Sequence, residues 1–145
     1  MMNQPLLEVD DLSVDFRTDA GWTRAVSNVS FSLDANRSLG IVGESGSGKS
    51  VCALSILRLH HKRTSRMPGS AIRFEGKDLL AMPEGGLRQV RGGDIAMIFQ
   101  DPMTSLNPVL TIADQIGETL RIHQGLDKAA ARRRAVELLD MVRIP

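Results

Sequence analysis

The sequence has few aromatic residues and a single cysteine. Aromatic side chains make up 3% of its 145 residues, and tyrosine is absent. Surfaces that stack single-stranded nucleic acid need several aromatic side chains, so the composition argues against nucleic acid as a partner. The one cysteine, Cys52, lies in an apolar run and is expected to be a small buried side chain. A disulfide framework is excluded, which fits a reducing compartment.

Long apolar runs and an excess of one charge are also missing. No stretch of the sequence approaches the roughly 18 apolar residues of a membrane span, and residues 1–5 lack the features of a signal peptide. The formal net charge of +1 gives no general attraction to nucleic acid or anionic lipid. The sequence therefore predicts a cytoplasmic protein that reaches a membrane only through a partner.

One phosphate-binding motif is present. Residues 43–50 read GESGSGKS and fit the P-loop pattern G-x-x-x-x-G-K-[ST]. Its glycines allow the backbone to approach a polyphosphate, and the N-terminus of the following helix favours an anion. We predict that Lys49 reaches the β- and γ-phosphates and that the Ser50 hydroxyl binds Mg²⁺. The residues predicted to bind nucleotide here are Gly43, Glu44, Ser45, Gly46, Ser47, Gly48, Lys49, Ser50 and Val51.

The flanking residues favour this reading over a chance match, which is expected in about one chain in a hundred of this length. Residues 39–42 form a short apolar run that predicts a buried parallel strand. Apolar residues from Val51 to Leu59 predict a helix that is buried on nearly all sides. A P-loop lies between a strand and a helix, as these predictions require.

Alternating apolar residues predict further strands. Residues 6–16 and 24–33 are expected to form an antiparallel pair, with a bend or bulge at Asp10–Asp11 and a turn at 18–21. A third strand is expected at 71–74, followed by a turn at Gly76–Lys77. The apolar residues 95–99 predict a second buried strand.

Helix signals dominate the rest of the chain. A short helix is expected over 83–91, broken by two glycines within it. Thr111 and Asp114 fit a capping box for a helix that ends at Gly125. Asp127 is expected to cap a last helix, in which Arg132–Arg134 form a solvated face. Its predicted apolar face consists of Ala131, Ala135, Leu138, Leu139 and Val142. Residues 60–66, HHKRTSR, read as a solvated basic loop rather than a metal site.

The residues after Phe99 distinguish among classes of P-loop protein. A Walker B aspartate would follow the apolar strand directly, but here Gln100 comes first and Asp101 second. Residues 40–50, GIVGESGSGKS, and 98–108, IFQDPMTSLNP, resemble the ATP-binding subunits of bacterial ATP-binding-cassette (ABC) peptide importers, the oligopeptide, dipeptide and glutathione group. The resemblance extends from Leu7 to Pro145.

This resemblance implies an α/β fold, the P-loop NTPase core of an ABC ATPase, present in part. Residues 6–145 would be a partial nucleotide-binding domain. An N-terminal antiparallel β subdomain and the P-loop core would occupy about 6–100. The Q-loop and the start of the α-helical subdomain would occupy about 100–145. The implied partners are transmembrane permease subunits, bound through the Q-loop region, and a second ATPase subunit in a dimer. The protein would then be peripheral on the inner face of the cell membrane.

The resemblance also implies ATP and Mg²⁺ as cofactors and two further site residues. Gln100 would sense Mg²⁺ and the γ-phosphate, and relay their state to the permease. Phe16 matches the aromatic position that stacks on adenine, with Trp22 as a weaker candidate. The alternative for Phe16 is an ordinary aromatic residue on the face of a sheet.

Several family features are missing or altered in this sequence. Asn36–Arg37 replaces the usual Gly-Glu, and His60–His61 replaces Leu-Pro. The signature LSGGQ, a Walker B with its catalytic glutamate and the switch histidine do not occur in the 145 residues. Two hypotheses therefore stay open. The chain is part of a subunit that couples ATP binding and hydrolysis to peptide import, or it is a truncated, non-hydrolysing nucleotide-binding fragment. A small-molecule kinase would need an acceptor site, and none is evident.

Overall fold

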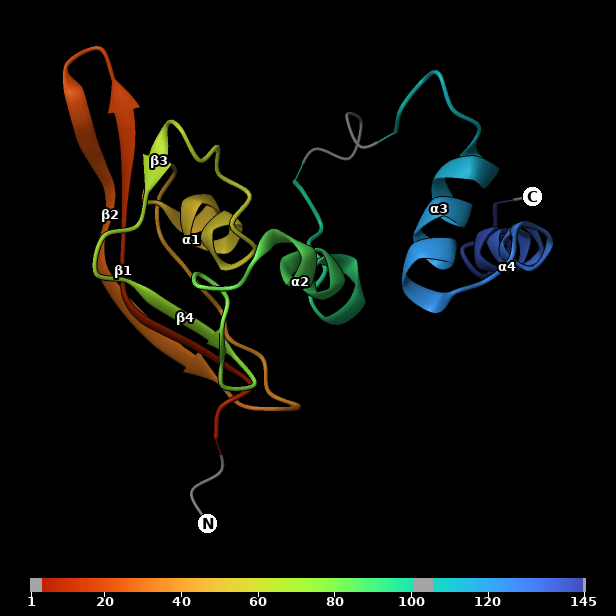
Figure 1. Cartoon of the computed structure of the whole chain (residues 1–145), viewed down its shortest axis with the longest axis horizontal. Helices are drawn as coiled ribbons and strands as arrows, with labels where there is room; N and C mark the ends of the chain where they lie inside the picture. Colours follow the sequence, from red (N-terminus) through yellow and green to blue (C-terminus); the bar gives the residue numbers. More distant parts are fainter. Residues whose placement is uncertain (1–3, 101–105, 145) are drawn as a thin grey trace. The chain divides into compact units, whose positions relative to one another are not determined.

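The computed structural model describes residues 4–100 and 106–144. Contacts divide the chain into two compact units, Met1–Leu87 and Arg88–Pro145 (Figure 1). The first unit holds the strands and the P-loop helix, and the second holds the long C-terminal helices. The predicted subdomain boundary near residue 100 stays a prediction.

Along the chain, one helix separates two long strands from three short ones, and the other helices follow. The elements are β1 (Leu7–Thr18), β2 (Gly21–Leu33), α1 (Lys49–Ile56), β3 (Ser65–Arg66), β4 (Ala71–Phe74), β5 (Lys77–Asp78), α2 (Glu84–Gln89), the wide turn η1 (Val90–Asp94), α3 (Ile112–Gln124) and α4 (Lys128–Met141).

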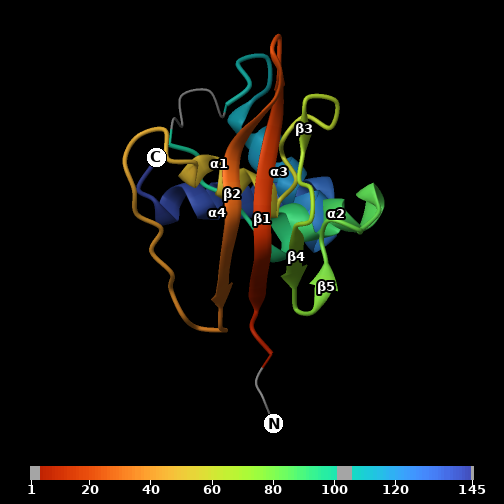
Figure 2. The same ribbon diagram turned by 90° about the vertical axis from the view of Figure 1, so that its left-hand side faces the viewer.

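The strands form one sheet with the order β2-β1-β4-β5, and β3 pairs with β1 beside β4. Every pairing between these described strands is antiparallel. Figure 2 shows β1 in the middle of the sheet, with β2 on one side and β3 and β4 on the other. The predicted antiparallel pair before the P-loop is therefore confirmed.

A bulge in β1 keeps its apolar side chains on one face. The register of β1 against β2 shifts between Val9 and Leu12, and Asp11 has a left-handed φ of 47°. Without an extra residue, a spacing of three would turn Leu12 to the opposite face from Val9. With it, Val9, Leu12 and Val14 are all buried, together with Ile72 of β4. The bulge predicted at Asp10–Asp11 is confirmed.

The helix α1 packs against β1 and β2 and starts in close contact with β2. Gly48, its N-cap, has φ 91°, and a Cβ added there would lie 2.9 Å from Cγ2 of the buried Val26. A side chain at this position would therefore separate the helix start from the sheet. Glycine satisfies both the positive φ and the close approach.

The predicted extent of this helix is wrong at its C-terminal end. α1 ends at Ile56 rather than at Leu59, and Arg58 has a positive φ of 49°. The Arg58 guanidinium donates hydrogen bonds to the carbonyl oxygens of Leu79 (3.1 Å) and Met82 (2.6 Å). These bonds support a chain reversal at Arg58, which stops the helix early.

The two predicted buried strands beside the P-loop and before Gln100 are also wrong. Residues 39–42 and 96–99 belong to no strand in the described structure, and Val42 and Ile98 are 93% and 97% exposed. A parallel strand exists only when a neighbouring strand satisfies its backbone. The two runs lie in different units, and neither is paired as a strand with another described segment. An apolar sequence alone does not provide the neighbouring strand that each run would need.

An ion-pair cluster around one buried carboxylate connects three strands. The Asp15 carboxylate of β1 is buried and accepts hydrogen bonds from Arg24 of β2 at 2.5 Å and from Arg66 of β3 at 3.0 Å. Arg66 also lies 4.4 Å from the ring centroid of Trp22, a cation–π distance. The bond from the Arg24 guanidinium, with that from Arg66, holds the pKa of Asp15 below its ordinary value of 3.8.

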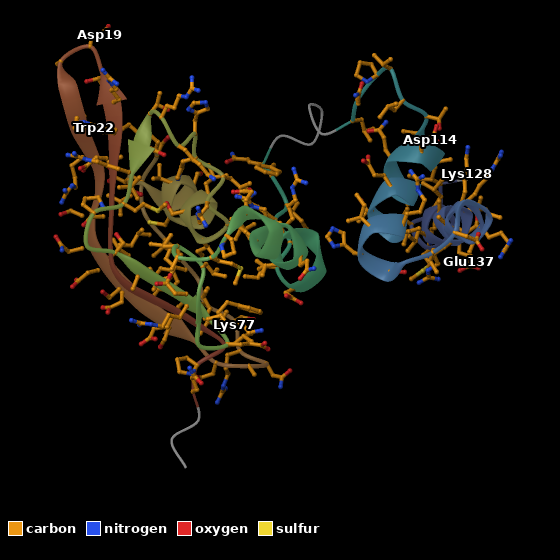
Figure 3. All side chains as sticks on the ribbon, viewed as in Figure 1. Asp19, Trp22, Lys77, Asp114, Lys128 and Glu137 are labelled. Atoms are coloured by element: carbon orange, nitrogen blue, oxygen red, sulfur yellow. The ribbon has the colours of Figure 1, made fainter. Side chains whose placement is uncertain are left out.

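The second unit contains two capped helices. The Thr111 side chain accepts a hydrogen bond from the Asp114 N–H at 3.1 Å, and α3 ends at Gly125 with φ 66°. Asp127 caps α4 by accepting from the Ala130 N–H at 2.7 Å. These predicted caps are confirmed, and Figure 3 labels Asp114 on the first turn of α3.

Small residues form the contact between these two helices. Ala131 and Ala135 of α4 are buried, and Ala131 lies beside the buried Gly117 of α3. Val142, which was predicted to belong to the apolar face, is 64% exposed because the helix ends before it. Residues 132–134 are exposed, as predicted. The helix α2 runs through both of its glycines, so the predicted break there is wrong.

We expect the substitution Asp15→Asn to destabilise the fold near neutral pH. Because the pKa of Asp15 is lower in the folded than in the unfolded chain, its ionised form stabilises the fold above the ordinary value. That contribution is lost as the pH falls through the folded-state pKa. In urea unfolding, the deficit of the variant should be clear at about pH 7 and much smaller at about pH 2. Asp19→Asn, at the exposed tip of the β1–β2 hairpin (Figure 3), is the matched control and should show neither effect.

We expect Gly48→Ala to cost more stability than Gly46→Ala. Both glycines have positive φ, 91° and 82°, so both substitutions introduce backbone strain of about 1–3 kcal/mol. Only the Cβ at position 48 meets Val26, whereas the Cβ at position 46 has no neighbour within 4 Å. Thermal unfolding of the two variants compares them directly. Equal losses of stability in the two variants would show that the close approach of Gly48 to β2 does not contribute to stability.

Candidate phosphate-binding site

The P-loop is a surface turn that leads into α1. The Ser47 N–H donates to the Glu44 carbonyl at 3.2 Å, and Gly46 adopts a positive φ of 82°. Residues 43–47 are exposed, so the loop is accessible from outside. The α1 helix then begins at Lys49, and its N-terminal end adds a partial positive charge to the same place.

Lys49 turns back over the loop. Its Nζ donates hydrogen bonds to the carbonyl oxygens of Gly43 at 2.7 Å and Glu44 at 2.6 Å, and lies 3.3 Å from Oγ of Ser47. The side chain is half-buried. The ammonium group therefore lies within the curve of the loop, which is where the sequence motif predicts that phosphate oxygens bind.

The loop turns tightly at Gly43. A Cβ at Gly43 would come within 2.6 Å of Oγ of Ser47, so any side chain at position 43 would crowd the turn. Ser50 is exposed on the first turn of α1, next to Lys49. An ammonium, a hydroxyl and several N–H groups are the donor and ligand types that a nucleotide phosphate with Mg²⁺ requires.

Phe16 lies in the same unit and is connected to α1 through His60. The two rings are 5.1 Å apart between centroids, at 83° between planes, which is an edge-to-face contact. His60 Nε2 lies 3.0 Å from the Val51 carbonyl oxygen and 3.1 Å from Oγ of Ser55. The predicted site residues Phe16 and Val51 are therefore joined by one intervening side chain.

Sequence reasoning missed this role of His60. It placed residues 60–66 in a solvated loop, whereas His60 is half-buried and Ser65–Arg66 form β3 against β1. The polar Ser55 of α1 was also overlooked, although it is fully buried. The signal that was available is the departure from the family pattern at positions 60 and 61.

Cys52 and Trp22 have structural roles. Cys52 is buried in α1, as predicted, and burial raises the pKa of its thiol. Trp22 is 43% exposed and carries Arg66 against its ring. It therefore belongs to the ion-pair cluster of Asp15.

Gln100 is exposed at the end of the described stretch 4–100. It belongs to the unit Arg88–Pro145, whereas the P-loop belongs to Met1–Leu87. Residues 101–105 of the predicted Q-loop lie outside the described residues. The sensing role of Gln100 stays a prediction. Among the helices of the described residues, none has the length and apolar character to cross a membrane.

Comparisons with known proteins show to which family the chain is related. A family model described as ABC transporter matches residues 26–145. A protein of Brucella abortus (strain 2308), assigned by its name to peptide import as an ATP-binding protein, is 62% identical over 97% of this chain. The peptidoglycan transport ATP-binding protein YejF of Agrobacterium fabrum (strain C58) is 54% identical, also over 97% of this chain. The chain spans 42% of the length of the first relative and 26% of the second.

The fold matches solved structures as well. The ATP-binding cassette MJ0796, solved as a dimer in a post-hydrolysis state bound to ADP and phosphate, superposes with a TM-score of 0.77. The match covers 93% of this chain and 56% of that one, at 21% sequence identity. This likeness supports the predicted fold, a partial α/β ABC ATPase cassette. The family match extends over more than four-fifths of the sequence. This chain therefore belongs to the ABC transporter family, as part of an ATP-binding cassette.

Proposed function

We propose that this chain binds ATP with Mg²⁺ through residues 43–51. The observation that carries the proposal is the position of the Lys49 ammonium, held by two loop carbonyls inside the curve of an exposed P-loop. The backbone N–H groups of the loop and the N-terminus of α1 would bind the α- and β-phosphates. Lys49 would turn to the β- and γ-phosphates as a positive charge.

Mg²⁺ would be held by the Ser50 hydroxyl, with Gln100 as a second ligand. When bound, Mg²⁺ would neutralise part of the charge of the phosphate groups. Ser50 is exposed beside Lys49 at the start of α1, which supports its part of this assignment. The part of Gln100 rests on the resemblance of its motif to the Q-loop.

The adenine base would stack on Phe16. The ring is half-buried, so it is anchored and still offers surface to a ligand. Phe16 and Val51 are joined through His60, which supports placing the base and the phosphates of one nucleotide at this part of the unit.

The whole protein would be an ATP-binding subunit that couples ATP binding and hydrolysis to the import of di- or oligopeptides, or of glutathione. The names of the relatives support transport of peptides and of peptidoglycan-related solutes. Transmembrane permease subunits and a second ATPase subunit would be its partners, at the inner face of the cell membrane. The dimeric cassette among the solved structures supports the dimer.

A second candidate function is nucleotide binding without hydrolysis. The residue after the apolar run 95–99 is Gln100 rather than an acid, and the 145 residues contain no LSGGQ. Phosphoryl transfer depends on positioned charges around the γ-phosphate. The groups present in this chain would hold a triphosphate but would not activate water against it.

Lys49→Ala is expected to weaken the binding of MgATP. The variant loses a charged hydrogen-bond donor to phosphate, about 1.5–3 kcal/mol, which corresponds to roughly 10- to 150-fold in affinity. Isothermal titration calorimetry measures the change. The control is Lys77→Ala, on β5 at the far end of the β4–β5 hairpin from the loop (Figure 3), which should bind like the parent chain. An unchanged affinity in Lys49→Ala would refute the site.

A turnover assay separates the two candidate functions. If the chain binds without hydrolysing, it should release phosphate from MgATP no faster than its Lys49→Ala variant does. Release well above background that disappears in Lys49→Ala would refute the non-hydrolysing reading. In either case, calorimetry on the same samples should show that the parent chain is loaded with nucleotide during the assay.

A further inference from the structure

We propose that His60 is a positioning residue for the nucleotide site, which fixes the Phe16 ring against the P-loop helix. The proposal rests on the proposed function, since it assigns His60 a part in recognising the base of the bound nucleotide. The family usually has Leu-Pro at positions 60–61, so His60 is one of the residues at which this sequence departs from the usual pattern.

The His60 imidazole is hydrogen-bonded to α1. Nε2 lies 3.0 Å from the Val51 carbonyl oxygen and 3.1 Å from Oγ of Ser55. The Ser55 hydroxyl donates its own proton to the Val51 carbonyl at 2.7 Å, so its oxygen is available as an acceptor. Both neighbours of Nε2 are therefore acceptors, and the arrangement assigns the proton of the imidazole to Nε2.

The same imidazole also contacts the Phe16 ring. The rings meet edge to face, at 5.1 Å and 83°. Such a contact restricts the orientation of the phenyl ring beyond what burial alone achieves. Phe16 is half-buried, so this restriction acts on a ring that has room to change its rotamer.

Backbone pairing between β1 and β3 brings His60 between Phe16 and α1. Phe16 of β1 is paired with Ser65 of β3, and the Arg17 N–H donates to the Thr64 carbonyl at 2.9 Å. The segment that contains His60 therefore runs from the end of α1 back to β1. His60 is tied to α1 by its side chain and to β1 through the strand that follows it.

The consequence for binding is a preformed base site. A ring held in one orientation loses less conformational freedom when adenine stacks on it, so the affinity for ATP is higher. In the proposed arrangement the base, and not the phosphates, would contact this ring. The contribution of His60 should therefore appear in the ratio of affinities for MgATP and for magnesium tripolyphosphate, which has the same charged groups without the base.

The test measures both ligands by calorimetry on the 145-residue chain and on His60→Ala, His60→Phe and His61→Ala. His61 is the matched control, because it is adjacent, exposed and contacts neither Phe16 nor α1 in the described structure. His60→Ala should lower the affinity for MgATP by roughly three- to tenfold, the range expected for one lost aromatic contact. Its affinity for tripolyphosphate should change by less than about twofold.

His60→Phe keeps a ring beside Phe16 but cannot donate to Val51, so it should lose less than His60→Ala. This variant also decides the question if His60→Ala does not fold, which circular dichroism would reveal. A double-mutant cycle with Phe16→Ala completes the test. In the Phe16→Ala background, His60→Ala should have no further effect on the ratio of the two affinities.

The outcomes separate this proposal from the function on which it rests. If the parent chain binds neither ligand, the proposed function fails and this inference fails with it. If the parent chain binds both ligands but the His60 variants match His61→Ala, only the role of His60 is overturned. Equal losses for MgATP and tripolyphosphate would also overturn it, because they indicate general damage to the loop.

Discussion

Backbone pairing on both edges of β1 is the constraint on which the first unit depends. β2 occupies one edge over almost the full length of the strand, and β3 and β4 share the other. The chain after α1 must therefore return to β1 within a few residues to form β3. This return places His60 beside α1. The carboxylate of Asp15 stabilises the return by joining β1 to β2 and to β3.

The features that the sequence predicted correctly are those determined by neighbouring residues. The caps at Thr111 and Asp127 are hydrogen bonds that span three residues, so their pattern is visible in a few letters. The β1–β2 hairpin and its bulge follow from local alternation and two adjacent aspartates. Residues 43–49 likewise form one continuous turn that Lys49 closes onto, while their part in nucleotide binding stays a prediction.

The predictions that failed concern interactions between distant residues. Residues 39–42 and 95–99 have the composition of buried strands, but a strand requires a partner that composition does not identify. The end of α1 is decided by Arg58 and the carbonyls of residues more than twenty positions away. In the sequence, His60 is one of several polar residues. Only the pairing of β3 with β1 places it beside Phe16. The departure from the family pattern at positions 60 and 61 marks the residue but does not identify Phe16 as its neighbour.

The hydrogen bonds of Lys49 to Gly43 and Glu44 have a consequence for ligand selectivity. An anion entering the loop must draw the ammonium away from two carbonyl oxygens that already satisfy it. A single weak charge, such as that of chloride, offers little advantage over those carbonyls. A polyphosphate would offer several charged oxygens at once and could replace both carbonyls as acceptors. The carbonyl oxygens of Gly43 and Glu44 would thus compete with a ligand for the ammonium, which would favour ligands of high charge density.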